Sequence, residues 1–360
     1  MKKILMAVGW EVQQTKKDDQ GKYPADLLLP DQKYWFFKHW PEDNLQIEVM
    51  GYRKIPLLSL IEKKFLHFHL FQSLRVLPKM KKYDLLIFFH SQIGLIPALF
   101  KSIFRIKTPL VLIDVEGIGR KNSWYLKPLI RKALSAVNLL FYLARLQKED
   151  YEKHYPEIIR RTKFIPFGLD IDRFKPQNSC PANYIISFGY GGLDARDWPT
   201  LFEAFGKLSK KMELVVIGKK GFSKKELKGL LLPKGVRTIP FSPLETLKKY
   251  IESSLFVILP LPYRAHAHGQ MSLLESMALG KAVIVAKTPG VIDYVEDRKN
   301  ALFYELANPS DLREKIEFLL NNPNETERLG INARKSVELL YNEEKMAQDI
   351  YFAVKDLYLN

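Results

Sequence analysis

Residues 260–295 read PLPYRAHAHGQMSLLESMALGKAVIVAKTPGVIDYV, and this stretch decides the fold. The apolar run 256–259 directly before it predicts a short buried strand. Ser272 is a suitable N-cap for a helix that runs to Leu279, and Gly280 ends that helix. A second apolar run, 282–285, follows at once. A strand, a loop, a helix and a strand in this order predict a βαβ unit of a parallel sheet.

The loop and the helix start of this unit have the composition of an anion site. In open α/β sheets, ligands bind beyond the carboxyl ends of the strands. Gly269 allows a close approach of the backbone, and the first N–H groups of the helix, at Gln270, Met271 and Ser272, favour a phosphate. Glu275, one turn later, can accept hydrogen bonds from a ribose diol. The spacing of Ser272 and Glu275 is also that of a capping box without a ligand, so both interpretations stay open.

A chain of 360 residues is too long for one ordinary core and predicts two domains. Short apolar runs alternate with amphipathic segments, which is typical of parallel α/β sheets. The expected strands of the first half are Lys3–Val8, Leu45–Met50, Leu85–Phe89, Leu110–Ile113, Leu139–Tyr142 and Lys163–Ile165. Those of the second half are Tyr184–Phe188, Leu214–Ile217, Val236–Ile239, Phe256–Leu259 and Ala282–Val285.

A break between the two series of strands, at about 172–182, predicts a linker, and Pro176–Pro181 has the composition of one. We therefore expect an α/β protein with two doubly wound, Rossmann-like domains, at 1–172 and 173–342. A last helix within 343–360 has apolar residues at helical spacing, and the first domain is one surface that it can cover.

The segment after 260 resembles the donor-site motif of retaining glycosyltransferases with the GT-B fold, notably glycosyltransferase family 4. Residues 276–284, SMALGKAVI, and 288–291, TPGV, continue the match. The resemblance implies two Rossmann-like domains that face each other across a cleft. It also implies that Glu275 holds the ribose of a nucleotide sugar. The family motif has two glutamates: Glu275 matches the second, and the first, which faces the donor sugar, is replaced here by Ala267.

Two histidines, His266 and His268, flank Ala267 and can contact the sugar in place of the missing glutamate. A pair of histidines two positions apart can also suggest a metal site, but the sequence supplies no third ligand beside them. We therefore expect no metal and no cofactor here, with the nucleotide sugar acting as a substrate.

Residues 189–201, GYGGLDARDWPTL, follow an expected strand. A glycine loop ahead of a helix brings backbone N–H groups to a pyrophosphate, which makes Gly189 and Gly191 candidates for donor binding. The resemblance places Arg196 where the family has a phosphate-binding lysine, and Tyr190 where it commonly has arginine. Lys219 can supply a further cation, although it is equally well explained as a solvated loop charge.

The sequence FIPFGLDIDRFKP at 164–176 is similar to the segment by which family members leave the first domain. Its Asp170 and Asp172 imitate a metal-binding Asp-x-Asp pair. The resemblance favours turn and interdomain roles for both aspartates, so we expect no metal there.

The first domain offers acidic residues at the end of the expected strand 110–113. Asp114 and Glu116 are our candidates for a general base or for orienting a sugar hydroxyl. Gly9 and His90 follow the first and third strands and are candidates for the acceptor side. A lone histidine is also a common loop residue, and that interpretation remains open.

The formal net charge of +16 suggests that the protein binds an anionic partner. Residues 53–132 hold sixteen Lys or Arg against Glu62, Asp84, Asp114 and Glu116. Within them, cations alternate with apolar residues: Lys63, Lys64, Arg75, Lys79, Lys81 and Lys82 with Phe65, Leu66, Phe68, Leu70, Phe71 and Leu74. This pattern fits either a peripheral contact with anionic lipid or a core-facing helix with a solvated basic face. No nucleic-acid motif accompanies the charge.

One cysteine, Cys180, cannot form an internal disulfide, which is typical of a reducing cytoplasm. The most apolar window, 85–104, includes His90, Ser91, Gln92 and Lys101 and is a poor membrane span. We expect a cytoplasmic protein that can act at the inner face of a membrane.

The resemblance implies transfer of a sugar from a nucleotide sugar to an acceptor hydroxyl, with retention of configuration, and the basic first domain favours a glycolipid or polysaccharide as the acceptor. Inversion with a carboxylate base stays open, and the sequence leaves the oligomeric state open. Two other hypotheses remain: a sugar-nucleotide epimerase of the same fold, and a non-catalytic binding protein that lacks the first glutamate.

Overall fold

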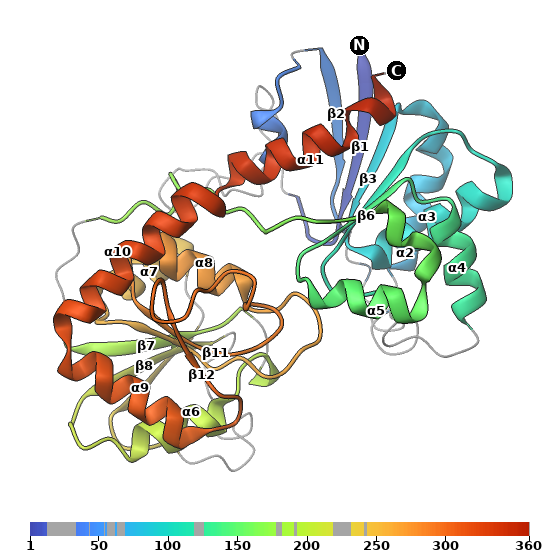
Figure 1. The fold of residues 1–360 in the computed structure, drawn as a ribbon. Helices are drawn as coiled ribbons and strands as arrows, with labels where there is room; N and C mark the ends of the chain where they lie inside the picture. Colours follow the sequence, from blue (N-terminus) through green and yellow to red (C-terminus); the bar gives the residue numbers. More distant parts are fainter. Residues whose placement is uncertain are drawn as a thin grey trace. The chain divides into compact units, whose positions relative to one another are not determined.

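The computed structural model describes residues 1–12, 34–42, 44–53, 55, 62, 69–118, 126–177, 182–190, 193–218, 232–240 and 243–359. Contacts divide the chain into two compact units. The first unit consists of Met1–Ile165 and Glu344–Asn360, and the second of Pro166–Glu343 (Figure 1).

The first unit is built on a six-stranded parallel sheet with the order β2-β1-β3-β4-β5-β6. Its strands are β1 Lys2–Val8, β2 Leu45–Met50, β3 Leu85–Phe89, β4 Leu110–Asp114, β5 Leu139–Tyr142 and β6 Thr162–Phe164. Its helical segments are η1 Trp35–His39, α2 Leu70–Val76, η3 Leu77–Lys82, α3 Ser91–Phe104, α4 Lys127–Ser135, α5 Leu146–His154 and η5 Pro156–Arg161. Every residue of the central strands β3 and β4 is buried, as expected for strands covered on both faces.

The last helix, α11 (Glu343–Tyr358), returns to the first unit (Figure 1). Its Tyr351 and Tyr358 rings pack against Trp40, with ring centroids 5.5 and 6.2 Å apart. Tyr351 also donates a hydrogen bond to Glu42. The last helix thus packs against residues that lie more than 300 positions earlier in the chain.

The second unit has its own six-stranded parallel sheet with the order β12-β11-β10-β7-β8-β9. Its strands are β7 Tyr184–Phe188, β8 Glu213–Gly218, β9 Val236–Pro240, β10 Val257–Leu259, β11 Val283–Ala286 and β12 Leu302–Tyr304. Its helical segments are η6 Leu193–Ala195, α6 Trp198–Gly206, α7 Leu244–Ser253, α8 Gln270–Ala278, α9 Pro309–Asn321 and α10 Pro323–Leu340.

Two chain segments lie side by side where the second unit begins and ends. The Leu169 N–H donates to the Tyr341 carbonyl at 2.8 Å, and the Glu343 N–H donates to the Leu169 carbonyl at 2.9 Å. The segment that enters the unit and the segment that leaves it are therefore hydrogen-bonded to each other.

The prediction of an α/β protein with two Rossmann-like domains is confirmed, and each expected strand overlaps an observed one. The sequence analysis missed β12. The prediction of Ser272 as an N-cap is wrong. The N-cap of α8 is Gly269, whose φ of 89° lies in the left-handed region, so the helix begins at Gln270.

At Gly330, α10 packs closely against the backbone of Gly280, because a Cβ on Gly330 would lie 2.2 Å from the carbonyl oxygen of Gly280. We expect Gly330→Ala to lower the free energy of unfolding by about 1–3 kcal/mol through overpacking, measured by urea denaturation. Ile331→Ala is the matched control, because its side chain is 61% exposed. Equal unfolding midpoints for the two variants would contradict this close contact between backbones.

Candidate functional site

The candidate site lies in the second unit, where α8 begins after the carboxyl end of β10. A Cβ at Gly269 would lie 2.5 Å from the Leu261 side chain, so this turn requires glycine for space as well as for conformation. The first helical hydrogen bond runs from the Leu273 N–H to the Gly269 carbonyl. The N–H groups of Gln270, Met271 and Ser272 precede it, and the positive end of the helix dipole lies there.

Arg196 is the cation of the site. Its side chain donates hydrogen bonds to the carbonyls of Phe188 (3.0 Å) and Ala195 (2.8 Å) and to Ser272 Oγ (2.8 Å). Burial lowers its pKa to about 10, so it remains charged at neutral pH. A guanidinium has five N–H groups, and the described residues supply acceptors for three of them. Two therefore remain for a ligand.

Glu275 is the carboxylate of the site, and its side chain is only 2% exposed. The Tyr190 hydroxyl donates to Glu275 Oε2 at 2.7 Å. Burial raises the pKa of Glu275 to about 8, although the Tyr190 hydrogen bond and the charges of Arg173 and Arg196 lower it. Such a carboxyl group gains from further hydrogen-bond donors, and a ribose diol supplies two. Tyr190 as a partner of Glu275 was missed from the sequence.

The loop between β10 and α8 is held by its neighbours. His268 Nε2 lies 3.2 Å from the Ala195 carbonyl, and the Asp197 N–H donates to the Pro260 carbonyl. Burial lowers the pKa of His268 and therefore favours its neutral ring. The His266 ring centroid lies 6.4 Å from that of His268. In the described ranges, no group of three or more His, Cys, Asp or Glu side chains is arranged to hold a metal ion.

The structure also brings Gly189 to Arg196, because a Cβ on Gly189 would lie 3.2 Å from the guanidinium carbon. Asp170 forms the expected turn, in which its carboxylate accepts from the N–H groups of Asp172 and Arg173. Several residues named from the sequence lie outside the described residues: Gly191, Lys219, Cys180, Lys63, Lys64, Phe65, Leu66 and Phe68.

Asp114, a candidate base in the first unit, is an internal anchor. Its carboxylate is fully buried and accepts from Ser91 Oγ (2.7 Å), the Tyr151 hydroxyl (2.5 Å) and the Gly117 N–H (3.2 Å). These bonds join the end of β4 to the first residue of α3 and to the second half of α5. These contacts give the buried Asp114 a structural role, and the catalytic role expected from the sequence stays a prediction.

The other candidates of the first unit lie at the carboxyl end of its sheet. Glu116 is exposed and accepts a hydrogen bond from Gln92. Gly9 and His90 are in contact, because a Cβ on Gly9 would lie 2.9 Å from His90 Cδ2. Burial lowers the pKa of His90 to about 4, so its ring is neutral at pH 7. Trp10, which the sequence analysis missed, packs beside His90 with ring centroids 6.2 Å apart.

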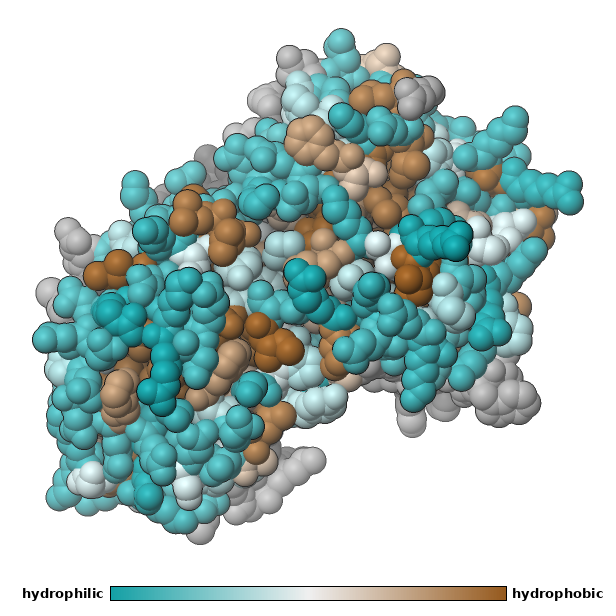
Figure 2. All heavy atoms as spheres, viewed as in Figure 1, coloured by the Kyte–Doolittle hydropathy of each residue, from teal (hydrophilic) through white to brown (hydrophobic). Residues whose placement is uncertain are grey.

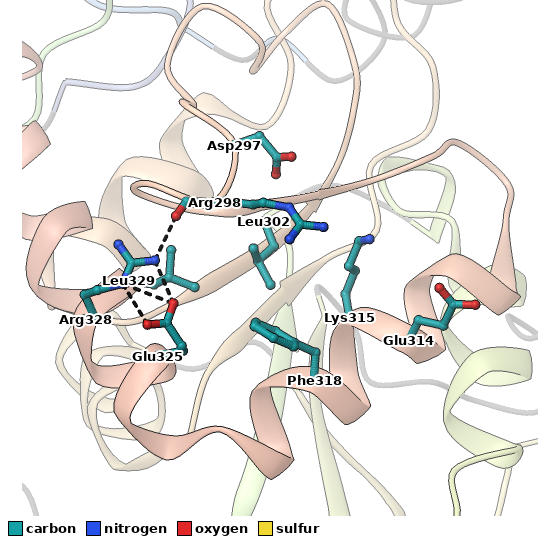
Figure 3. Close-up of a pocket in the computed structure, with 9 residues that line it drawn as sticks. All are labelled: Asp297, Arg298, Leu302, Glu314, Lys315, Phe318, Glu325, Arg328 and Leu329. Atoms are coloured by element: carbon teal, nitrogen blue, oxygen red, sulfur yellow. Dashed lines mark hydrogen bonds and ion pairs between the residues drawn. The ribbon is translucent and has the colours of Figure 1, made fainter.

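A separate pocket of about 340 Å³ lies in the second unit beside α9 and α10 (Figure 3). Leu302, Phe318 and Leu329 form its apolar part, and Arg328 is paired with Glu325 at its side. None of the residues predicted from the sequence lines it. We therefore place the candidate site at Arg196 and Glu275.

The raised pKa of Glu275 generates a prediction about stability. The pKa is higher in the folded protein than the usual 4.5, so the folded state loses stability as pH rises from about 4.5 to about 8. We expect Glu275→Gln to remove this loss, so that the variant gains about 3 kcal/mol relative to the native protein between pH 4.5 and 7. Urea denaturation across this pH range measures the difference.

The control for this experiment is Glu327→Gln, at an exposed position of α10. The effect of Glu275→Gln on stability should change with pH more than that of Glu327→Gln. Equal pH dependence of the two variants would show that the folded protein does not raise the pKa of Glu275.

Comparison with protein families matches residues 172–336 to the model described as "Glycosyl transferases group 1". An uncharacterized glycosyltransferase of Methanocaldococcus jannaschii is 24% identical over 254 residues, 67% of this chain and 66% of that protein. The N,N'-diacetylbacillosaminyl-diphospho-undecaprenol alpha-1,3-N-acetylgalactosaminyltransferase of Campylobacter jejuni is 35% identical over 81 residues. The match to the Campylobacter protein covers 22% of this chain and 20% of that protein. The matched parts of this chain therefore span less than two thirds of the length of both relatives.

Solved structures share the fold over the whole chain. HepE of Anabaena in complex with UDP has a TM-score of 0.71 at 15% identity, covering 99% of this chain and 100% of that one. A second structure of HepE is in complex with UDP-glucose. Sucrose-phosphate synthase of Thermosynechococcus elongatus has a TM-score of 0.74 at 14% identity and covers 100% of both chains. The matched region contains the Arg196 and Glu275 site, and over its whole length the chain shares the GT-B fold of these solved structures.

Proposed function

We propose that this protein transfers a sugar from a nucleoside diphosphate sugar to a hydroxyl group of an acceptor. The observation that carries the proposal is the pairing of a buried cation, Arg196, with a buried carboxyl group, Glu275, at the start of α8. The HepE structures with UDP and UDP-glucose support a uridine nucleotide as the first donor to test.

In this proposal Glu275 accepts hydrogen bonds from the ribose, and the diphosphate lies at Arg196 and the first N–H groups of α8. The bond between the anomeric carbon and the diphosphate oxygen breaks, a bond to the acceptor oxygen forms, and the proton of the acceptor hydroxyl passes to the departing diphosphate. Arg196 and the helix dipole offset the negative charge that develops on the leaving diphosphate, so the reaction is proposed to need no metal.

We propose retention of the anomeric configuration, as the resemblance implies. Inversion requires a base at the acceptor hydroxyl, and the hydrogen bonds around Asp114 occupy the carboxylate that was one candidate. Glu116, which is exposed, is the remaining carboxylate for an inverting reaction. The coupling constant of the anomeric proton in the product separates the two outcomes.

We propose that the acceptor is a glycolipid or a lipid-linked saccharide. The name of the Campylobacter relative describes transfer to a sugar on diphospho-undecaprenol, which supports this class. No helix in the described part of the chain is both long enough and apolar enough to span a bilayer. Access to such an acceptor would therefore come from docking on the membrane surface.

The first unit has a surface suited to anionic lipid. Helices α3 and α4 lack Asp and Glu and are joined by a hydrogen bond from Lys101 to the Ala136 carbonyl. Their exposed apolar side chains are Ile103, Phe104 and Leu129, and the exposed cations beside them include Arg105, Lys107 and Lys132. In the basic segment named from the sequence, Lys79 is paired with Glu48, while Lys81 and Lys82 are exposed.

Variants at the donor site test the proposed function. We expect Arg196→Ala and Glu275→Ala to weaken UDP binding about 10- to 100-fold in calorimetry, because each loses hydrogen bonds to or from a charged group. Lys207→Ala, at an exposed position near the end of α6, is the control and should bind normally. Arg196→Lys keeps the charge and provides a second variant if the alanine protein fails to fold.

Analysis of the products decides between reactions of this fold. With UDP-sugar and no acceptor, the proposed transferase leaves the configuration of the sugar unchanged. An inverted sugar centre in the nucleotide sugar would identify an epimerase instead. Tight UDP binding without transfer or hydrolysis across a panel of acceptors would identify a non-catalytic binding protein.

Vesicle sedimentation tests the membrane surface. We expect binding to vesicles rich in phosphatidylserine that falls as salt rises, and loss of binding in the double variant Ile103→Ser, Phe104→Ser. The control is Ile331→Ser, Leu339→Ser, because these side chains are equally exposed on α10, where Figure 2 shows apolar side chains at the surface. Equal binding to neutral vesicles, or equal loss in both variants, would contradict the proposal.

A further inference from the structure

Several buried polar atoms of the second unit, Ser187 Oγ and Arg313 Nε among them, have no hydrogen-bond partner within the described residues, and three further ones lie near the carboxyl edge of its sheet. These three are Gln270 Nε2, Thr288 Oγ1 and the Tyr304 hydroxyl. Gln270 is 7% exposed, Thr288 2% and Tyr304 1%, so bulk water does not supply the missing partners. Buried polar groups in folded proteins are normally paired, and each exception calls for an explanation such as a ligand.

The three groups follow three neighbouring strands of one sheet. Gln270 is the first residue of α8, after β10, Thr288 comes two residues after β11, and Tyr304 ends β12. The loop of Thr288 is packed against the chain that enters α8, because a Cβ at Gly290 would lie 2.3 Å from the His268 carbonyl oxygen. They therefore gather at the carboxyl edge of the sheet, where α8 begins.

Arg196 connects this group to the donor site. The Tyr304 hydroxyl interacts electrostatically with Asp197, the N-cap of α6, and with Arg196. Burial and the charge of Asp197 raise the pKa of Tyr304, so the phenol keeps its proton and can donate it. The same guanidinium interacts electrostatically with Glu275 and Tyr190.

The chemistry of the unpaired atoms indicates the ligand. An amide NH₂ only donates hydrogen bonds, and threonine and tyrosine hydroxyls can donate theirs. The two remaining N–H groups of Arg196 and the first N–H groups of α8 are donors as well. A site made of donors around a cation matches phosphate oxygens, which only accept. The threonine and tyrosine hydroxyls can also accept from a sugar hydroxyl, but the charge of Arg196 favours the anionic oxygens of a phosphate.

We propose that Gln270, Thr288 and Tyr304 bind the diphosphate of the nucleotide sugar, beside Arg196. This inference rests on the proposed function and adds three residues to its donor site. Thr288 and Tyr304 donate hydrogen bonds to oxygens of the leaving diphosphate. The diphosphate is then the hydrogen-bond partner that these two hydroxyls lack among the described residues.

Thr288→Val and Tyr304→Phe test the inference, because each removes a hydroxyl with little change of shape. We expect both variants to raise the melting temperature of the ligand-free protein, since an unpaired buried hydroxyl disappears. We expect the same variants to weaken binding of UDP about 5- to 20-fold in calorimetry and to lower kcat. Binding of uridine, which has no phosphate, should change less than twofold.

The matched control is Tyr358→Phe. The Tyr358 hydroxyl is buried and unpaired among the described residues too, but it lies on α11 in the first unit. We expect Tyr358→Phe to raise the melting temperature while UDP binding stays as in the native protein. Higher melting temperatures for Thr288→Val and Tyr304→Phe with unchanged UDP binding would overturn the inference.

The failure of the proposed function has a different signature. If the native protein binds none of UDP, GDP, ADP and dTDP, with or without sugars, both the proposed function and this inference fail. If the native protein binds UDP and loses this affinity in Arg196→Ala but in neither hydroxyl variant, only the inference fails.

Discussion

The buried guanidinium of Arg196 is the interaction on which the candidate site depends. It bonds to the carboxyl end of β7, to the turn of η6 and to the first turn of α8 through Ser272. A cation this deeply buried is costly unless its hydrogen bonds are satisfied. The protein meets this cost with two main-chain carbonyls and a hydroxyl, and these contacts fix where α8 begins relative to the sheet.

A site arranged before the ligand arrives needs little reorganisation when charge develops in a reaction. Arg196 and the positive end of α8 supply positive potential. Burial disfavours the charged form of Glu275, whose hydrogen-bond donor is Tyr190. The burial of Glu275 thus lowers the stability of the second unit. This is the usual exchange of stability for function at binding sites.

Much of this arrangement could be predicted from the sequence. Buried parallel strands are short apolar runs, so their positions and the site at their carboxyl ends followed from the pattern, and Glu275 and Arg196 followed from the resemblance. Contacts between distant residues could not be predicted. Tyr190 reaches a residue 85 positions away, and Asp114 is buried by Ser91 and Tyr151, which no local pattern connects to it. The start of α8 was misplaced because Ser272 looks like a cap but accepts from Arg196.

The return of α11 to the first unit has a consequence for biosynthesis. The first unit consists of two chain segments, and its second segment is synthesised after the whole of the second unit. The second unit, which is continuous from Pro166 to Glu343, has its whole sequence available earlier. Domains generally fold as units and in the order of their synthesis. Here the C-terminal unit can be complete while the N-terminal sheet still exposes the surface around Trp40, so the order of completion is the reverse of the order in the chain.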